Sequence, residues 1–199
     1  GYFGKPHTIL QSTPNLFQIE IADMDEDGDL DIVGFSKSIN GFILWYENNG
    51  VQKCEKEHTV FEDGNSIEKI RLTDFDQDGN MDVLAIYNKH MYLFKNEDNA
   101  QTFGEPIEIF YVGNNFLDFY TKKNLDLNKD GSFEMVYYES TSNDNSFIKI
   151  LRKSGNEQLE LIQTIQGLST SVDFEDFDQD GYLDAMVMKN GELAWKRND

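Results

Sequence analysis

Short stretches of the chain place apolar side chains at every second position. Residues 17–21, with the sequence Phe-Gln-Ile-Glu-Ile, are the clearest example, and residues 67–72 and 172–174 are their counterparts. Alternation with a period of two predicts a β-strand that buries one face. No stretch carries apolar residues at helical spacing between helix caps over three turns. The pattern therefore predicts an all-β chain.

Three further kinds of strand are predicted, and each kind occurs four times. Continuous apolar runs, which are typical of strands buried on both faces, occupy residues 32–35, 83–87, 135–138 and 185–188. A third strand follows each run, over residues 42–46, 91–94, 147–151 and 193–195. A fourth, marked by His-Thr-Ile-Leu and its variants, covers residues 8–10, 59–61, 107–110 and 159–162. Four short strands per unit, with turns rich in Asn, Gly and Asp, predict the blades of a β-propeller.

The units repeat at intervals of 50 to 52 residues, so we expect a β-propeller of four four-stranded blades, with about 51 residues per blade. Residues 1–199 would form a single β-propeller domain, with blades over about 15–62, 66–112, 115–165, and 169–199 together with 1–13. Pairing of residues 2–10 with residues 190–197 would close the ring and cover edge strands. A piece of a larger propeller, or a ring completed by a second chain, is the alternative.

The third unit is the least regular. Residues 121–125, Thr-Lys-Lys-Asn-Leu, interrupt the alternation expected before its acidic loop. We expect the aromatic stretch over residues 116–120 to supply the packing instead. Residues 140–146 lengthen the hairpin that follows. This blade is therefore expected to be the most distorted.

Each unit contains an acidic nine-residue loop between its first and second strands. The loops begin at Asp23, Asp74, Asp126 and Asp176 and follow the pattern Asp-x-Asp/Asn-x-Asp-Gly-x-x-Asp/Glu. The glycine at position 6 permits a positive φ that curls the backbone, so the side chains at positions 1, 3 and 5 converge. A backbone carbonyl at position 7 and a carboxylate at position 9 would complete a set of hard oxygen donors. Such a set suits Ca²⁺, which takes roughly six to eight oxygen ligands.

The predicted metal ligands come from positions 1, 3, 5, 7 and 9 of each loop, which gives up to four Ca²⁺ ions. They are Asp23, Asp25, Asp27, Asp29, Asp31, Asp74, Asp76, Asp78, Asn80, Asp82, Asp126, Asn128, Asp130, Ser132, Glu134, Asp176, Asp178, Asp180, Tyr182 and Asp184. The third loop departs most from the pattern, because Asn128 replaces a carboxylate and Glu134 is longer than aspartate. Zinc and copper would require His or Cys, which these loops lack.

An EF-hand is excluded by two features of the loops. It needs a glutamate at position 12 and a helix on either side. Position 12 is Gly34, Ala85, Tyr137 or Val187, and the flanking residues have β-strand patterns.

Charge and cysteine content narrow the function further. The formal net charge is −20, which argues against nucleic acid as a partner because phosphate binding needs a basic face. No apolar run approaches about 18 residues, so no membrane insertion is expected. Cys54 is the only cysteine, so no disulfide can form within the chain. His7 and His58 occupy equivalent places in the repeat and are interpreted as structural markers rather than catalysts.

These residues resemble the FG-GAP/VCBS family of β-propeller repeats, which includes the calcium-bearing blades of integrin α-subunits. The resemblance rests on the four acidic loops, on residues 45–50 (Trp-Tyr-Glu-Asn-Asn-Gly) and on residues 3–9 (Phe-Gly-Lys-Pro-His-Thr-Ile). It implies Ca²⁺ in the hairpin between the first and second strands of each blade, with all four ions on one side of the disc. It also implies an extracellular, periplasmic or cell-surface location.

The function expected from these features is that of a non-catalytic, Ca²⁺-stabilised recognition and adhesion module that binds a protein or a glycan. Candidate contact residues are Tyr46, Tyr87, His90, Tyr138 and Trp195, although each also suits blade packing. One alternative is a polysaccharide lyase-like enzyme or its accessory domain. That alternative requires a cleft in which His90 or Lys189 meets a carboxylate outside the loops, and the sequence shows no nucleophile–base constellation. A structural self-assembly module is the other alternative.

Overall fold

The structure is a computed structural model, in which the chain forms two compact units, residues 1–107 and 108–199. It describes residues 2–10, 15–37, 41–50, 54–64, 66–97, 99–100, 102–114, 116–120, 125–140, 146–166, 172–189 and 192–198. Regular structure in this part of the chain is β-strand, apart from one 3-10 turn, so the all-β prediction is confirmed. No helix among the described residues is long and apolar enough to cross a membrane. The two units are described separately below.

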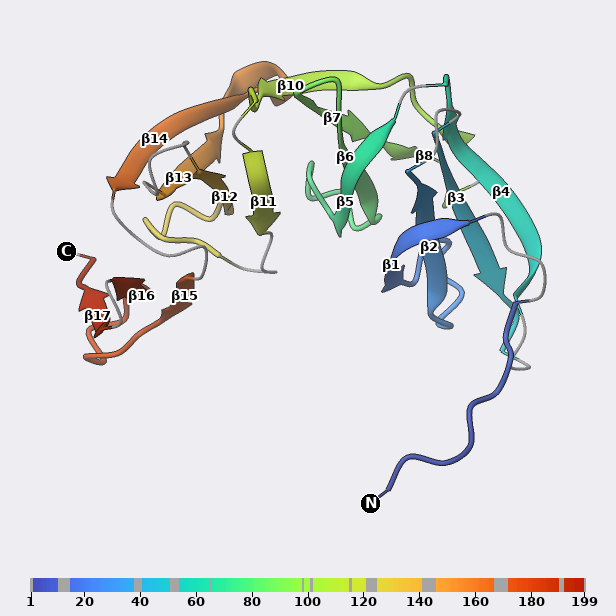
Figure 1. The fold of residues 1–199 in the computed structure, drawn as a ribbon, viewed down its shortest axis with the longest axis horizontal. Coiled ribbons are helices and arrows are strands. Elements are labelled where there is room, and N and C mark those ends of the chain that lie inside the picture. The colour runs from blue at the N-terminus through green and yellow to red at the C-terminus, as the bar shows by residue number, and fades with distance from the viewer. Residues whose placement is uncertain are drawn as a thin grey trace. The chain divides into compact units, whose positions relative to one another are not determined.

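The first unit contains two four-stranded antiparallel sheets and a short ribbon (Figure 1). One sheet has the order β1-β2-β3-β4, with β1 at Leu16–Ala22, β2 at Asp31–Ser36, β3 at Phe42–Asn48 and β4 at Cys54–Glu62. The second has the order β10-β7-β6-β5, with β5 at Ile67–Thr73, β6 at Asp82–Tyr87, β7 at His90–Phe94 and β10 at Ile107–Tyr111. The ribbon pairs β8 (Asn96–Glu97) with β9 (Thr102–Phe103). The boundary between the units falls within β10.

The second unit contains a four-stranded sheet and a three-stranded sheet. The larger one has the order β11-β12-β13-β14, with β11 at Phe116–Tyr120, β12 at Glu134–Ser140, β13 at Ser146–Lys153 and β14 at Leu159–Gln166. A single 3-10 turn, η1 (Gly155–Glu157), connects β13 and β14. The smaller sheet has the order β15-β16-β17, with β15 at Val172–Glu175, β16 at Asp184–Lys189 and β17 at Glu192–Lys196. Residues 116–120, which were expected to supply the packing of the third repeat, form its first strand, and Phe119 within it is 1% exposed. Of the stretches expected to distort that repeat, 121–125 and 140–146, positions 121–124 and 141–145 lie outside the described residues.

The second strand of each sheet is the most deeply buried, as its continuous apolar sequence predicts. Every residue of β2 and β6 is buried. In the first unit Val33, Phe35, Trp45 and Val83 belong to one hydrophobic cluster. The core of the first unit therefore lies between its two four-stranded sheets.

Strand β1 has the predicted alternation, but its apolar face points to solvent. Phe17 is 61% exposed and Ile21 is 58% exposed. The polar residues alternate with them on the less exposed face, where Gln18 donates to the Ile70 carbonyl at 3.3 Å and Glu20 pairs with Arg71 at 2.8 Å. A period of two identifies a strand but does not say which face the neighbouring sheet covers.

The predicted fourth strand over residues 8–10 is not present in this structure. Residues 2–10 are described and form no strand. The Ile9 carbonyl instead accepts a hydrogen bond of 3.4 Å from the backbone N–H of Cys54, at the start of β4. The sheet of the last repeat accordingly has three strands in the described part of the chain. Ring closure and the single propeller domain therefore stay predictions.

Candidate functional site

The four acidic loops lie in the hairpins between the first and second strands of the four sheets. Three have antiparallel registers that pair the residue before the loop with position 9: Ala22 with Asp31, Thr73 with Asp82 and Glu175 with Asp184. Each of these three loops thus begins where its first strand ends, and its last residue is the first of the next strand. The position of the loops in these hairpins, which the family resemblance implied, is observed.

Each loop contains two residues with a positive φ. The glycine at position 6 has φ values of 93° in Gly28, 104° in Gly79, 85° in Gly131 and 92° in Gly181. Position 4 is not glycine, yet it also adopts the left-handed conformation, with φ near 60° in Glu26, Gln77, Lys129 and Gln179. Non-glycine residues reach this region at a cost of roughly 1 kcal/mol. This strain was not visible in the sequence, because Glu, Gln and Lys are ordinary helix-forming residues.

The side chains of positions 1 and 5 hold the loop in this curl. The carboxylate at position 1 accepts the backbone N–H of the glycine at position 6, at 3.0 Å from Gly28 to Asp23 and 2.9 Å from Gly181 to Asp176. The carboxylate at position 5 accepts the backbone N–H of position 7, at 2.8 Å from Asp29 to Asp27. The same bonds recur in the other loops, including 2.8 Å from Asn80 to Asp78, from Ser132 to Asp130 and from Tyr182 to Asp180.

The remaining carboxylate oxygens of the loops face one another. In loops 1, 2 and 4 the side chains at positions 1, 3 and 5 each offer an oxygen within 4.8 Å of the others; in loop 3 the group is Asp126, Asp130 and Glu134. Within the described residues, Oδ1 of Asp23, Asp74 and Asp176 is buried without a hydrogen-bond partner. A buried acceptor without a partner costs about 1–3 kcal/mol, and more if charged. The residues therefore fit a hard divalent cation, which would pair with these oxygens.

Position 9 has a structural role that the sequence did not indicate. In loop 2, Asp82 is 1% exposed, and its two oxygens accept the backbone N–H of Phe75 at 2.9 Å and of Asn96 at 2.8 Å. Asp31 and Asp184 make the same pair of bonds in loops 1 and 4. Each carboxylate thus ties the start of its own loop to the end of the third strand. Burial is the main cause that raises the pKa of Asp82 to about 6, and the two backbone hydrogen bonds only partly offset it.

Loop 3 uses the longer Glu134 differently. Its Oε2 accepts the backbone N–H of Leu127 at 2.6 Å, whereas Oε1 is buried and has no partner in the described part of the chain. The other three repeats have Asn48, Asn96 or Asn198 at the end of the third strand, and this repeat has Lys153 there. Oε1 of Glu134 is therefore left for a ligand. Loop 3 is the loop in which the position 9 carboxylate belongs to the cluster of possible metal ligands.

The asparagine after the third strand is the main residue that sequence reasoning missed. Its side-chain amide donates to the position 8 carbonyl of its own loop, at 3.0 Å from Asn48 to Leu30 and 3.2 Å from Asn96 to Met81. In two repeats it also reaches the preceding loop, because Asn198 donates to the Leu127 carbonyl at 2.6 Å, as Asn96 does to Met24. The recurrence of Asn at this place was the only available sequence signal.

The residue just before that asparagine sets the charge beside each loop. Lys95 pairs with Asp76 at 3.1 Å, and Arg197 pairs with Asp178 at 3.0 Å and with Asp180 at 3.1 Å. Loop 1 has the acidic Glu47 there. The pKa of Asp25 is raised, first by burial and then by the negative charge of Asp27, with a further contribution from the negative charge of Glu47. At this position beside loop 1 the chain therefore has a carboxylate, whereas beside loops 2 and 4 it has a cation.

Four of the five proposed contact residues divide into two groups, and the fifth, His90, is half-buried at the start of β7. Tyr46, Tyr87 and Tyr138 are at most 7% exposed and belong to the packed core. Trp195 is 40% exposed and contacts Phe177, with ring centroids 5.2 Å apart. The side chain of Lys189, considered for a catalytic role, lies outside the described residues.

Comparisons with known proteins address the fold and the repeat. Residues 23–85 match a family model described as an FG-GAP-like repeat. The chain is also similar to the structure of an Agrocybe aegerita lectin, described as recognising non-reducing terminal N-acetylglucosamine, with 17% sequence identity and a TM-score of 0.52. The similarity covers 92% of this chain and 54% of the lectin chain, so the chain spans about half the length of that protein. No curated protein sequence matches the chain.

The matched segment contains loops 1 and 2 and residues 45–50, which are part of the set on which the family resemblance rested, whereas loops 3 and 4 and residues 3–9 lie outside it. At 17% identity, the likeness to the lectin shows the fold alone. Residues 23–85 are therefore similar to an FG-GAP-like repeat, within a chain that shares an all-β fold with this lectin.

Proposed function

We propose that this chain is a non-catalytic, Ca²⁺-stabilised recognition module with one Ca²⁺ site in each acidic loop. The observation that carries the proposal is the buried, unpartnered Oδ1 of the position 1 aspartate in loops 1, 2 and 4 of the described chain. Bound Ca²⁺ would supply the positive charge that these oxygens lack. The carboxylates at positions 1, 3 and 5 and the carbonyl at position 7 are oxygen donors of the kind that Ca²⁺ takes. Repulsion within each cluster would otherwise oppose folding.

Calcium titration of chelator-stripped protein tests the proposal directly. We expect calorimetric heats that saturate at up to four ions per chain, and a melting temperature that rises by many degrees with Ca²⁺. The variant Asp23→Asn should lose one site, whereas Glu105→Gln, which removes an exposed acid outside the loops, should lose none. Equal melting curves in Ca²⁺ and in chelator, with no titration heat, would reject the metal role.

The proposed ligand is a protein or a glycan, and the proposed location is extracellular, periplasmic or at the cell surface. Likeness to a glycan-binding lectin supports the recognition role. Millimolar Ca²⁺ outside cells would fill loops of modest affinity, which supports the location. Glycan-array and pull-down screens in Ca²⁺ test the role; no ligand in either would count against it.

We also propose that the repeats form a four-bladed propeller closed by residues 2–10. Two observations support closure: the apolar face of β1 is exposed, and the last sheet has three described strands, with Leu193 of β17 74% exposed. The sequence His7-Thr8-Ile9 also matches His58-Thr59-Val60 of β4, the fourth strand of the first sheet. Amide hydrogen exchange tests this, because closure predicts slow exchange in residues 8–10, and slow exchange in β17 that is lost when residues 2–10 are deleted.

A further inference from the structure

A polar pocket of about 490 Å³ lies beside loop 1 in the first unit. Loop 1 contributes Asp25, β3 contributes Trp45 and Glu47, and β4 contributes Lys56 and His58. The turn between β8 and β9, at residues 99–100, forms the remaining wall. This volume lies within the roughly 300–1,000 Å³ range of small-molecule pockets. Neither the repeat motif nor the metal loops account for it.

Trp45 and His58 give the pocket an aromatic wall. The two rings stack in parallel, with centroids 4.0 Å apart and an interplanar angle of 9°. Trp45 is 2% exposed, and its Nε1–H has no hydrogen-bond partner among the described residues. A buried indole N–H usually has a partner. Trp45 therefore lines the pocket through its stacked ring, while its Nε1–H is covered by the protein rather than open to the pocket.

Glu47 organises the charged groups of the pocket. Its Oε2 accepts hydrogen bonds from Lys56 Nζ at 3.0 Å and lies 3.1 Å from His58 Nε2. The hydrogen bond from Lys56, followed by that from His58, lowers the pKa of Glu47, so this carboxylate is ionised at neutral pH. Donors and acceptors of both signs are therefore fixed within one pocket, and the two carboxylates make it unsuited to an anion.

The turn that forms the far wall is held in place by Asn96. Asn96 Oδ1 accepts the backbone N–H of Ala100 at 2.5 Å, while its Nδ2 donates to the Met24 carbonyl in loop 1. Asp25, the next residue of that loop, lines the pocket. The pocket wall and the metal loop are thus connected through one buried side chain.

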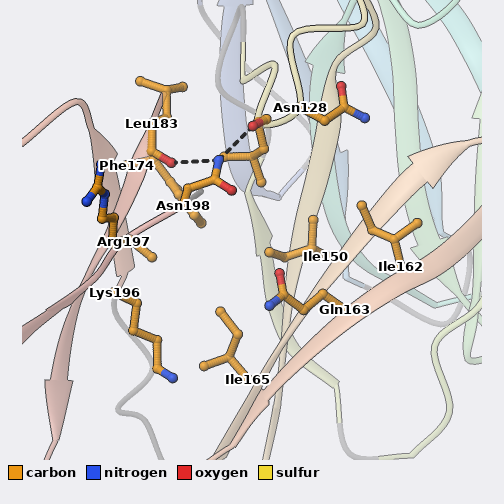
Figure 2. Close-up of a pocket in the computed structure, with 12 residues that line it drawn as sticks. Asn128, Ile150, Ile162, Gln163, Ile165, Phe174, Leu183, Lys196, Arg197 and Asn198 are labelled. Carbon is orange, nitrogen blue, oxygen red and sulfur yellow. Dashed lines mark hydrogen bonds between the residues drawn. The ribbon is translucent and has the colours of Figure 1, made fainter. Parts of the chain in front are cut away.

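The second unit has a pocket of about 350 Å³ at the equivalent place, shown in Figure 2. Strand register makes Ile150 and Gln163 the equivalents of Trp45 and His58, because each pair lies directly opposite across the third and fourth strands. Asn128 is the equivalent of Asp25. Isoleucines 150, 162 and 165 surround this pocket, and Asn198 bonds to the Leu127 and Leu183 carbonyls at its edge (Figure 2). The second-unit pocket therefore has Ile150 and Gln163 where the first has the stacked Trp45 and His58, and its charged lining residues are Lys196 and Arg197, with no carboxylate among the lining residues.

We propose that the first-unit pocket binds a neutral sugar residue of a glycan, with Glu47 accepting from its hydroxyl groups, Lys56 Nζ donating to them and the Trp45 ring forming the wall beside it. A polyhydroxyl ring offers donors and acceptors together, which matches this lining better than an anion or an apolar group. The proposal rests on the recognition role proposed above and assigns that role a site and a ligand class. Asp25 belongs to both the loop and the pocket, so Ca²⁺ in loop 1 would fix one wall.

Tryptophan signals provide a specific test, because the chain contains two tryptophans and Trp195→Phe leaves Trp45 alone. In Ca²⁺ buffer, this variant is titrated with free N-acetylglucosamine, galactose, mannose and glucose, while the indole N–H cross-peak of Trp45 is followed by NMR. We expect a saturable shift with at least one sugar. Glu47→Gln should weaken that binding about tenfold or more, because a hydrogen bond to a charged group is lost. The matched variant Gln163→Ala, in the second-unit pocket, should bind as before.

Three results would overturn the proposal: no shift with any of these sugars, an unchanged affinity in Glu47→Gln, or an equal loss in Gln163→Ala. Circular dichroism of each variant establishes that it is folded. The Ca²⁺ melting shift is measured on the same samples. If Ca²⁺ still raises the melting temperature but no sugar binds, the sugar pocket is rejected and the proposed metal sites stand. If sugar binds but Ca²⁺ does not change the melting temperature, the proposed metal sites are rejected and the sugar pocket stands.

Discussion

Asn96 Nδ2 donates a hydrogen bond of 2.8 Å to the backbone carbonyl of Met24, which lies 72 residues earlier in the chain. The bond joins the end of the third strand in one repeat to position 2 of the acidic loop in the preceding repeat. Asn198 makes the same connection to Leu127, 71 residues earlier. One asparagine thus links consecutive acidic loops within each unit.

Replacing Asn96 with alanine should destabilise the protein more than the same change at Asn48. Asn96 is 2% exposed, and its side chain takes part in three hydrogen bonds, to Met24, Met81 and Ala100. Buried backbone groups left without partners cost about 1–3 kcal/mol each, so we expect a loss of about 2–4 kcal/mol. Asn48 is partly exposed and makes no link to a preceding loop among the described bonds, so its loss should be about 1 kcal/mol. Urea unfolding in Ca²⁺ measures both; equal losses would contradict the linking role.

Stability of the metal-free protein should depend on pH through Asp82. Its pKa is raised from 3.8 to about 6 in the folded state, so the folded protein binds more protons than the unfolded chain in this window. The contribution of Asp82 to stability is therefore fully present below pH 3.8 and is lost as pH rises through about 6. Relative to Asp82→Asn, which does not titrate, the unmodified protein should lose about 3 kcal/mol between these limits. Chemical unfolding of both proteins in chelator at several pH values measures the difference, and a difference that does not vary with pH would contradict the prediction.

Removing the cation beside loop 2 should strengthen Ca²⁺ binding there. Lys95 Nζ lies 3.1 Å from Asp76 and so opposes a second positive charge. We expect Lys95→Gln to raise the affinity of loop 2 about threefold to tenfold at low ionic strength, with a smaller effect at high salt. Lys37→Gln is the control, since Lys37 lies over the Phe17 ring at 4.5 Å and away from the loops. Calorimetric titration at two salt concentrations measures the Ca²⁺ affinity and its salt dependence. A similar gain in affinity in Lys37→Gln would mean that the change in net charge, and not the position of Lys95, causes the effect.

Alanine at Gly28 should cost stability for a conformational reason only. Gly28 has φ +93°, and a Cβ added there would meet no atom within 4 Å. An L-residue in this region costs roughly 1–2 kcal/mol, so Gly28→Ala should destabilise by about that amount. Gly155 has equally open space without a positive φ, so Gly155→Ala should be neutral or slightly stabilising. Thermal unfolding of both variants in chelator measures the difference, and equal melting temperatures would show that the loop tolerates the side chain.

Most strands could be predicted because their signal is local. A period of two or a continuous apolar run between turn residues located β2, β6 and β12 to within a few residues. The faces of β1 could not be predicted, since Phe17 and Ile21 follow the right period but are exposed. Residues 8–10 have a strand pattern and form no strand, because a strand also needs an edge with which to pair, and that edge is not specified locally.

The acidic loops were visible in the sequence because every predicted ligand of one loop lies within nine residues. The chain alone determined where the loops occur, that glycine is needed at position 6 and that the donors are oxygens. Tertiary structure decided that position 9 binds two backbone amides, that Asn96 and Asn198 join consecutive loops, and that Trp45, Glu47 and His58 share a pocket with Asp25. These relationships bring together residues from different strands, and in the case of Asn96 from different repeats. Their geometry depends on strand register and on the packing of one sheet against the next, which no local pattern encodes.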